Sequence, residues 1–420
     1  MSFDWTDETL GDLISRDEAH LQTGPFGTAL KASEYSEDGV PLISVREIRE
    51  GFLQIVKDTP RVCEATTQRL PKFLLQQGDI VFGRKGAVDR NAVISFEQEG
   101  WFLGSDGIRL RLSNKYDSLF FSYLMRSSAT RAWLLQNSEG TTMLSLNQKT
   151  LARVPVRYPT VEIQKRISTQ LRTLDDKITL NIKINQTLEE MAQAIFKSWF
   201  VDFDPVKAKM NGEQPKGMDA ATASLFPEKL VESELGLIPE GWEPKQLKDI
   251  LELAYGKALK KTDRVEGDVP VYGSGGLTGY HNQSLVEGPG IIVGRKGTVG
   301  SVYWEPKAFY PIDTVFYVKP KTGYSLKYCH LVLQNLGLKD MNTDAAVPGL
   351  NRNNAYRLDV ITPNEPVLKK FEEMMQSFQS KVDANNAQNA SLESLRDTLL
   401  PKLLSGEIEL EQAQELAEVE

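Results

Sequence analysis

Histidine and cysteine are scarce in this 420-residue sequence, which contains three of the former and two of the latter. His20, His281 and His330 are too scattered to predict a metal site, and Cys63 and Cys329 form no metal-binding or redox spacing. The sequence also lacks a G-x-x-x-x-G-K-[ST] phosphate loop, a G-x-S-x-G nucleophile motif and an N/D-P-P-[FYW] methyltransferase tetrapeptide. It therefore predicts no catalytic residue, no metal ligand and no cofactor bound by this chain.

Long apolar runs are missing as well. No stretch of about eighteen apolar residues occurs, so we expect no membrane span. The acidic start, MSFDWTDETLGDLISR, lacks the basic and apolar regions of a signal peptide. The sparse cysteines suit a reducing compartment. These features predict a cytoplasmic protein.

An excess of positive charge, the usual mark of a DNA-binding protein, is absent, since the formal net charge is −8. The negative charge is unevenly distributed, however. Residues 1–158 contain 19 Lys and Arg against 20 Asp and Glu, residues 240–362 contain 15 against 13, and six acidic residues follow Gly406. Residues 1–158 and 240–362 are thus nearly neutral. Tight DNA binding by such nearly neutral segments would need a partner that supplies further positive charge.

What the sequence does contain is an internal repeat, which decides the architecture. The pattern Trp-x₄-Leu-x-Asp-[LI] at residues 5–13 returns at residues 242–250. VFGRKGAV at residues 81–88 returns as IVGRKGTV at residues 292–299, and TTMLSLN at residues 141–147 returns more loosely as AAVPGLN at residues 345–351. Short apolar runs punctuated by Gly and Pro predict that each copy is a mixed, strand-rich domain.

After the third shared motif, both copies continue into a heptad pattern whose spacing alternates between four and three residues. The first seam is Ile167, Leu171, Leu174, Ile178, Asn181, Asn185, Leu188, Ala192, Ile195 and Trp199. The second is Phe371, Met375, Phe378, Val382, Asn385, Asn389, Leu392, Arg396, Leu399 and Leu403. This period predicts two coiled-coil helices. Two amphipathic helices that pack on separate cores remain the alternative.

Two asparagines interrupt the middle of each apolar seam, namely Asn181 and Asn185 in the first and Asn385 and Asn389 in the second. A buried Asn lowers stability but penalises wrong registers, in which its amide would face hydrocarbon. Both antiparallel and parallel pairing would bring these asparagines together. They therefore predict a register without fixing the direction of pairing.

The repeated Gly-Arg-Lys-Gly motif is the main candidate for chemistry. Glycines allow a tight turn and a close approach to a partner, and the cations suit phosphates or guanine edges. Phosphate positioning is favoured, because identical residues in both copies cannot distinguish two different half-sites. The predicted DNA contacts are Gly83, Arg84, Lys85, Gly86 and Asn147 in the first copy and Tyr272, Gly273, Ser274, Gly294, Arg295, Lys296, Gly297, Asn351 and Arg352 in the second. A solvated surface turn is the alternative.

Four further segments carry a family resemblance: FKSWFVDFDPVKAK at residues 196–209, ELGLIPEGW at residues 234–242, the YGSGG loop that starts at Tyr272, and LLPKLLSG at residues 399–406. With the repeat and the heptads, they make the whole chain resemble the specificity subunit of type I restriction–modification systems. The resemblance implies an α+β fold in which two target-recognition domains are separated by two long helices that pair as an antiparallel coiled coil, with a pseudo-twofold internal repeat. It maps the recognition domains to residues 1–158 and 240–362 and the helical spacers to residues 159–203 and 363–406. Composition predicts the rest: residues 204–239, rich in Pro, Gly, Ala and Ser, are expected to be a linker, and residues 407–420 an acidic tail.

The resemblance also implies partners and cofactors. Two modification (methyltransferase) subunits and the restriction (motor and nuclease) subunits would join this non-catalytic chain on double-stranded DNA with a bipartite target. S-adenosylmethionine, ATP and Mg²⁺ would be bound by those partners. A coiled-coil scaffold without DNA reading, and the specificity part of a methyltransferase-only system, remain alternatives. One departure is Pro401, which stands where the first copy has Lys197 and is expected to interrupt the second helix near its end.

Overall fold

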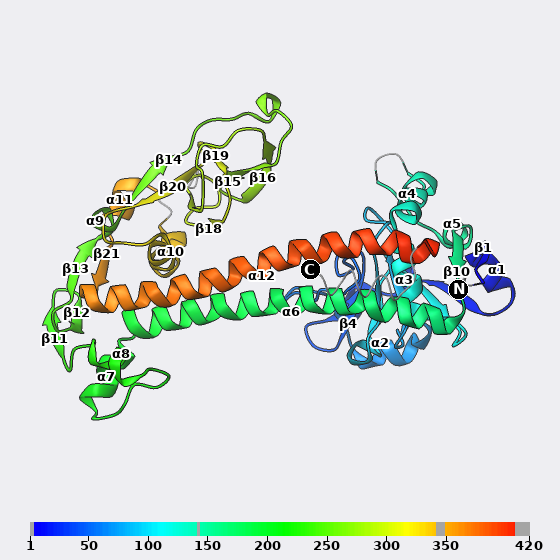
Figure 1. Cartoon of the computed structure of the whole chain (residues 1–420), viewed down its shortest axis with the longest axis horizontal. Helices are drawn as coiled ribbons and strands as arrows, with labels where there is room; N and C mark the ends of the chain where they lie inside the picture. Colours follow the sequence, from blue (N-terminus) through cyan, green and yellow to red (C-terminus); the bar gives the residue numbers. More distant parts are fainter. Residues whose placement is uncertain (1–3, 141–142, 342–348, 408–420) are drawn as a thin grey trace. The chain divides into compact units, whose positions relative to one another are not determined.

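The computed structural model describes residues 4–140, 143–341 and 349–407 (Figure 1). These residues form two compact units. The first unit comprises Met1–Asn181 with Asn386–Glu420, and the second comprises Ile182–Asn385. The boundaries between the units fall within two long helices, α6 (Val161–Phe200) and α12 (Glu365–Ser405).

The first unit is built on a four-stranded antiparallel sheet in the order β2 (Ala19–Thr23), β9 (Gly107–Leu112), β6 (Ile80–Gly83) and β7 (Asn91–Val93). A smaller sheet contains β3 (Tyr35–Ser36), β5 (Arg61–Val62), β4 (Val40–Ile43) and β8 (Phe102–Leu103), and β1 (Thr6–Thr9) pairs with β10 (Pro155–Tyr158). The helices are α1 (Leu10–Ser15), α2 (Glu64–Arg69), α3 (Ser118–Arg126), α4 (Ser128–Asn137) and α5 (Gln148–Ala152).

The second unit repeats this plan. Its four-stranded antiparallel sheet has the order β14 (Leu251–Tyr255), β20 (Val315–Pro320), β17 (Gly290–Gly294) and β18 (Val302–Glu305). A smaller sheet contains β16 (Gly276–His281), β15 (Val269–Gly273) and β19 (Tyr310–Pro311), and β13 (Glu243–Gln246) pairs with β21 (Asp359–Thr362). The short helices are α9 (Leu247–Ile250), α10 (Leu326–Asn335) and α11 (Arg352–Tyr356). The predicted internal repeat is thus a repeat of strand order.

Within each unit, α6 and α12 lie side by side and run antiparallel (Figure 1). In the first unit the Asp175 carboxylate accepts a hydrogen bond from Arg396 Nη1 at 3.0 Å. In the second unit the rings of Phe200 and Phe371 lie 4.9 Å apart. The later residue of α6 thus contacts the earlier residue of α12, as antiparallel pairing requires. This confirms the expected fold class and its antiparallel helix pair.

The asparagines meet as the heptads predict. Asn181 Nδ2 donates to Asn389 Oδ1 at 2.8 Å in the first unit, and Asn385 Nδ2 donates to Asn185 Oδ1 at 2.8 Å in the second. Asn181 and Asn385 are buried, so these amides must find polar partners within the seam. The apolar seam positions of both helices are buried or half-buried, which is what a heptad seam requires.

The expectation for Pro401 is wrong. Helix α12 continues through Pro401 to Ser405. A proline inside a helix removes one backbone hydrogen bond and crowds the preceding turn. Here the surrounding leucines compensate, because Leu399, Leu400, Leu403 and Leu404 are all buried in the core of the first unit. Packing of this last apolar turn outweighs the local preference of proline.

The segment at residues 204–239 contains regular structure. It forms α7 (Asp204–Met210), α8 (Ala220–Ser224) and a hairpin of β11 (Leu230–Ser233) and β12 (Gly236–Pro239). Several of its side chains, including Val206 and Phe226, join the aromatic core around Trp199 and Trp242 in the second unit.

The repeated Trp-x₄-Leu motif precedes the first strand, β2 or β14, of the four-stranded sheet in each unit. The leucines of this motif, in α1 and α9, are buried.

Candidate nucleic-acid interface

The first Gly-Arg-Lys-Gly motif forms a tight turn at the end of β6. A Cβ atom on Gly83 would lie 2.4 Å from the carbonyl oxygen of Ala87, and Gly86 has a φ of +76°. Only glycine meets both requirements without strain. The third shared motif docks onto this turn, because Leu146 N donates to Arg84 O at 2.8 Å and Gly86 N donates to Leu144 O at 2.8 Å.

The second motif forms the same turn at the end of β17. A Cβ atom on Gly294 would lie 2.1 Å from the carbonyl oxygen of Thr298, and Gly297 has a φ of +85°. Leu350 N donates to Arg295 O at 2.8 Å, which reproduces the docking of Leu146. The structure therefore brings the second and third shared motifs together in each unit. Residues 141–142 and 345–348 of the third motif lie outside the described residues.

Both motif arginines are held against the protein. Arg84 Nη1 donates to the Ser105 carbonyl at 3.2 Å, and its guanidinium lies 4.5 Å from the centre of the Phe26 ring. Arg295 Nη1 donates to the Asp313 carbonyl at 2.9 Å, and its guanidinium lies 4.9 Å from the Tyr255 ring. These contacts fix the direction of each half-buried cation. The arginines support the turn and leave only part of the guanidinium free for a partner.

The lysines differ between the two turns. Lys85 and Lys296 are both exposed. Lys85 Nζ forms an ion pair with Asp106 at 3.2 Å, whereas none of the described carboxylates pairs with Lys296. The position of Asp106 is occupied in the second unit by Thr314, since Arg84 N donates to Asp106 O and Arg295 N donates to Thr314 O. Counting only the residues that the structure describes, the second turn has the less compensated positive charge.

The predicted asparagines cap short helices. Asn147 Oδ1 accepts from Thr150 N at 2.8 Å at the start of α5, and Asn351 Oδ1 accepts from Asn353 N at 2.9 Å at the start of α11. A capping Asn satisfies backbone N–H groups that lack a partner within the helix. The amide oxygens are thereby committed to the helix starts, and the residues that follow the asparagines, Gln148 and Arg352, come two positions after the leucines bonded to the motif arginines.

The glycine-rich loop lies next to the second turn. A Cβ atom on Gly297 would lie 3.2 Å from Ser274 Oγ, and the Ser274 carbonyl accepts from Ser301 Oγ at 2.8 Å. The Tyr272 hydroxyl donates to the Glu305 carboxylate at 2.8 Å, and burial together with that carboxylate raises the pKa of Tyr272. Tyr272, Gly273 and Ser274 thus flank the turn, and the Tyr272 hydroxyl already has a partner.

Sequence reasoning missed the aromatic partners of the motif arginines. Phe26 follows β2, whereas Tyr255 is the last residue of β14, so the two rings come from different positions of the repeat. Both rings are about half exposed. No shared motif marks Phe26 or Tyr255 in the sequence, so the sequence offers no direct signal for either ring. Among the described residues, no group of three or more His, Cys, Asp or Glu side chains is arranged to hold a metal ion.

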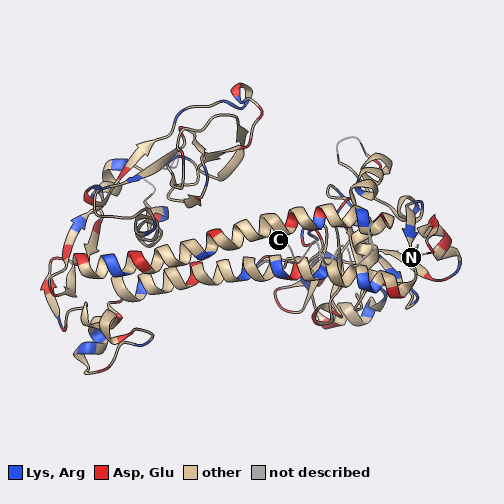
Figure 2. Cartoon of the chain, viewed as in Figure 1, with Lys and Arg blue, Asp and Glu red and all other residues tan. Residues whose placement is uncertain are grey.

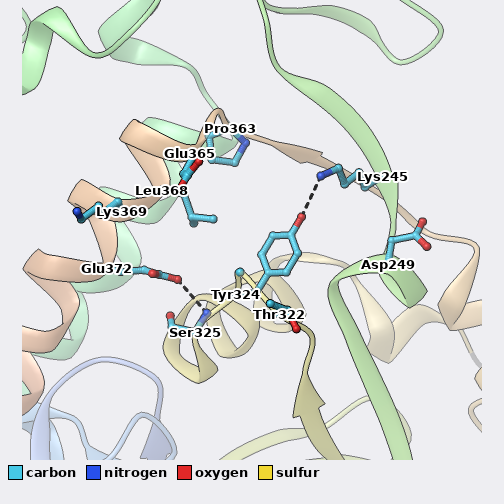
Figure 3. Close-up of a pocket in the computed structure, with 11 residues that line it drawn as sticks. Lys245, Asp249, Thr322, Tyr324, Ser325, Pro363, Glu365, Leu368, Lys369 and Glu372 are labelled. Atoms are coloured by element: carbon cyan, nitrogen blue, oxygen red, sulfur yellow. Dashed lines mark hydrogen bonds between the residues drawn. The ribbon is translucent and has the colours of Figure 1, made fainter.

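An open pocket of the second unit lies away from these residues, at the start of α12 (Figure 3). Lys245 Nζ donates to the Tyr324 hydroxyl at 3.3 Å, and Ser325 N donates to the Glu372 carboxylate at 2.9 Å. These polar groups satisfy one another and hold α10 against α12.

The comparisons with known proteins agree with this geometry. The family model for the type I restriction modification DNA specificity domain matches residues 4–190 and again residues 239–394. The chain belongs to this family. It is the DNA specificity subunit of a type I restriction–modification system, a non-catalytic part of that enzyme. The double match coincides with the repeated strand order and the two Gly-Arg-Lys-Gly turns.

Two curated relatives are similar over most of the chain. The type I restriction enzyme HindI specificity subunit of Haemophilus influenzae is 28% identical over 353 residues, which cover 69% of this chain and 77% of the relative. The MjaIX specificity subunit of Methanocaldococcus jannaschii is 24% identical over 415 residues, which cover 91% and 90%. The crystal structure of the type I S subunit from M. genitalium has a TM-score of 0.53 at 19% identity and covers 96% of each chain. This last similarity supports the fold.

None of the described helices combines the length and the apolar character needed to cross a membrane.

Proposed function

We propose that each of the two units contacts the DNA backbone through its Gly-Arg-Lys-Gly turn, and that each reads one half of a bipartite double-stranded target. The observation that carries this proposal is the repetition of the whole frame. In both units a glycine-bounded turn ends a central strand, carries an exposed lysine and an arginine held against an aromatic ring, and is braced by the third shared motif. Exposed cations and backbone N–H groups at such turns suit phosphate oxygens.

The proposed division of the chain is residues 1–158 and 240–362 as recognition domains, with the helical spacers at residues 159–203 and 363–406. The helices α6 and α12 would dock two modification subunits, and the restriction subunits would complete the assembly. Along both helices, Lys and Arg are interspersed with Asp and Glu (Figure 2), so neither helix carries a long run of positive charge. This mixed charge favours a protein partner at the helices and DNA at the turns.

Catalysis would then reside in the partners, which would bind S-adenosylmethionine, ATP and Mg²⁺. A methyltransferase-only system would use the same specificity chain without restriction subunits. The proposed site of action is the cytoplasm, and the near-neutral charge of the recognition segments implies that tight DNA binding requires the assembled complex.

Charge reversal of the two exposed lysines tests the backbone contact. We expect the Lys85→Glu, Lys296→Glu double variant, assembled with its modification subunits, to bind every DNA sequence more weakly while methylating the same motif. Each lost phosphate contact should reduce the slope of log affinity against log salt by roughly 0.9. Equilibrium binding at several salt concentrations measures this.

The matched control is Lys216→Glu, an exposed lysine between α7 and α8, which should leave the salt slope unchanged. A chain that serves only as a coiled-coil scaffold would bind no less DNA after reversal of Lys85 and Lys296. That outcome would contradict the proposal.

A further inference from the structure

The residue that directly follows the capping asparagine is Gln148 in the first unit and Arg352 in the second. Both are the first residues of short helices, α5 and α11, and both follow a leucine bonded to the carbonyl of a motif arginine. They occupy the same place in the repeated frame, beside the turn that we propose to contact DNA. A residue that reads bases must differ between the two units if the two half-sites differ. The turn residues are identical, whereas these two are not.

Gln148 is held so that half of its amide stays free. Its Nε2 donates to Thr23 Oγ1 at 2.9 Å, and Thr23, the last residue of β2, is buried. The amide keeps its Oε1 acceptor and its second N–H, and Gln148 is exposed. One acceptor and one donor in the plane of an amide match N6 and N7 of adenine in the major groove.

Arg352 is held by rings instead. Its guanidinium lies 4.7 Å from the centre of the Tyr255 ring and 5.7 Å from the Tyr356 ring. Tyr255 is the last residue of β14, the strand that corresponds to β2, and the Tyr356 hydroxyl accepts from Leu253 N of that strand at 2.9 Å. The same pair of positions, the strand end and the first helical residue, therefore interacts in both units with different chemistry.

The guanidinium of Arg352 also has unused donors. Its Nε is buried without a hydrogen-bond partner, so the terminal N–H groups are the ones that a ligand could reach, and none of the described carboxylates pairs with them. The cation–π contact with Tyr255 holds the guanidinium in place without consuming its terminal N–H groups. Two parallel N–H donors in one plane match O6 and N7 of guanine.

We infer that Gln148 and Arg352 are specificity-determining residues, which read one purine in each half-site: adenine through Gln148 and guanine through Arg352. This inference rests on the proposed function, because it requires the turns to face DNA. Thr23 and Tyr255 are the positioning residues that set the two planes.

The test maps methylated adenines in DNA from cells that carry the complex with wild-type, Arg352→Gln or Arg352→Lys chains. We expect Arg352→Gln to lose preference for guanine at one position of one half-site, by on the order of 10- to 100-fold, and to leave the other half-site unchanged. Arg352→Lys keeps the charge but loses the two-donor plane, so it should relax the same position. Gln148→Arg should alter one position of the other half-site.

A uniform loss of methylation in Arg352→Gln with an unchanged motif, and full activity in Arg352→Lys, would overturn the inference and make Arg352 a phosphate contact. Unchanged motifs and efficiency in all three variants would overturn it as well. Co-purification of each variant with its modification subunits confirms that the chain has folded. Failure of the proposed backbone contact would look different. The salt slope of the Lys85→Glu, Lys296→Glu variant would be unaltered, while the methylation motifs of the Gln148 and Arg352 variants would still change.

Discussion

The strands that lead into the two turns have the same place in the fold but different support. Asp79, which precedes β6, is almost fully buried, and its carboxylate accepts from Arg111 Nε and Nη2, each at 2.7 Å. Gly290 stands at the corresponding position of β17, where the buried Phe309 ring fills the space of a side chain. The Asp79–Arg111 ion pair and the Phe309 ring thus support the two strands at corresponding positions. The repeated turn depends on backbone geometry, whereas the side chains that support its strand differ between the two units.

The largest expected effect comes from breaking this support. Asp79→Ala leaves the Arg111 guanidinium without its carboxylate and the N–H of Gln76 without its acceptor. We therefore expect the free energy of opening of β6 to fall by about 2–3 kcal/mol. Gly290→Ala places a Cβ atom 2.3 Å from the Phe309 ring and should lower the free energy of opening of β17 by about 1–3 kcal/mol. Amide hydrogen exchange resolves the two strands separately in the intact chain.

The matched control is Gly290→Ala combined with Phe309→Leu, which makes room for the new methyl group and should recover part of the loss. Equal destabilisation of β6 and β17 by either single variant would show that the strands open as one unit and would contradict the comparison.

The contrast between the strands also shows what the sequence reveals. The turns and the helix pair were predictable, because a Gly-Arg-Lys-Gly motif and a heptad period are local patterns. The sequence predicts Asn147 and Asn351 as DNA contacts, although an Asn just before a short helix is equally a capping signal. The partners of the motif arginines were not predictable, because Phe26 and Tyr255 reach them through the fold. Pro401 shows that buried leucines override a local preference.

A smaller effect is expected from the helices behind the sheets, where His330 of α10 occupies the place of Ser122 in α3. His330 is buried, and burial, followed by the nearby Lys327 ammonium, holds its pKa below the usual range against the opposing Glu189 carboxylate. The unfolded chain therefore binds a proton near pH 6.5 that the folded chain does not bind until a lower pH. We expect α10 to lose stability as the pH falls below about 6.5, by roughly 1 kcal/mol per pH unit.

In α3 the corresponding Ser122 hydroxyl donates to Asn91 Oδ1 at 2.6 Å and does not titrate. Hydrogen exchange of α10 and α3 at pH 7 and pH 5 measures the difference, after correction for the intrinsic exchange rates. His330→Phe should remove most of the pH dependence of α10. If α10 of that variant remains as sensitive to pH as the wild type, His330 is not the responsible group.

The smallest expected effect concerns the two lysines, and it separates the turns most directly. Lys85 is already paired with Asp106, whereas Lys296 has Thr314 at that place and forms no ion pair with the carboxylates that the structure describes. We therefore expect Lys296→Ala to weaken DNA binding by the assembled complex several-fold, and Lys85→Ala to weaken it less.

Exchanging the residues beside the two lysines should reverse this order: Asp106→Thr releases Lys85, and Thr314→Asp engages Lys296. Because the backbone carbonyls of residues 106 and 314 hold the arginine N–H groups, these exchanges leave the turn intact. If Lys296→Ala and Lys85→Ala weaken binding equally, both alone and when combined with the two exchanges, local pairing does not set the strength of the backbone contact.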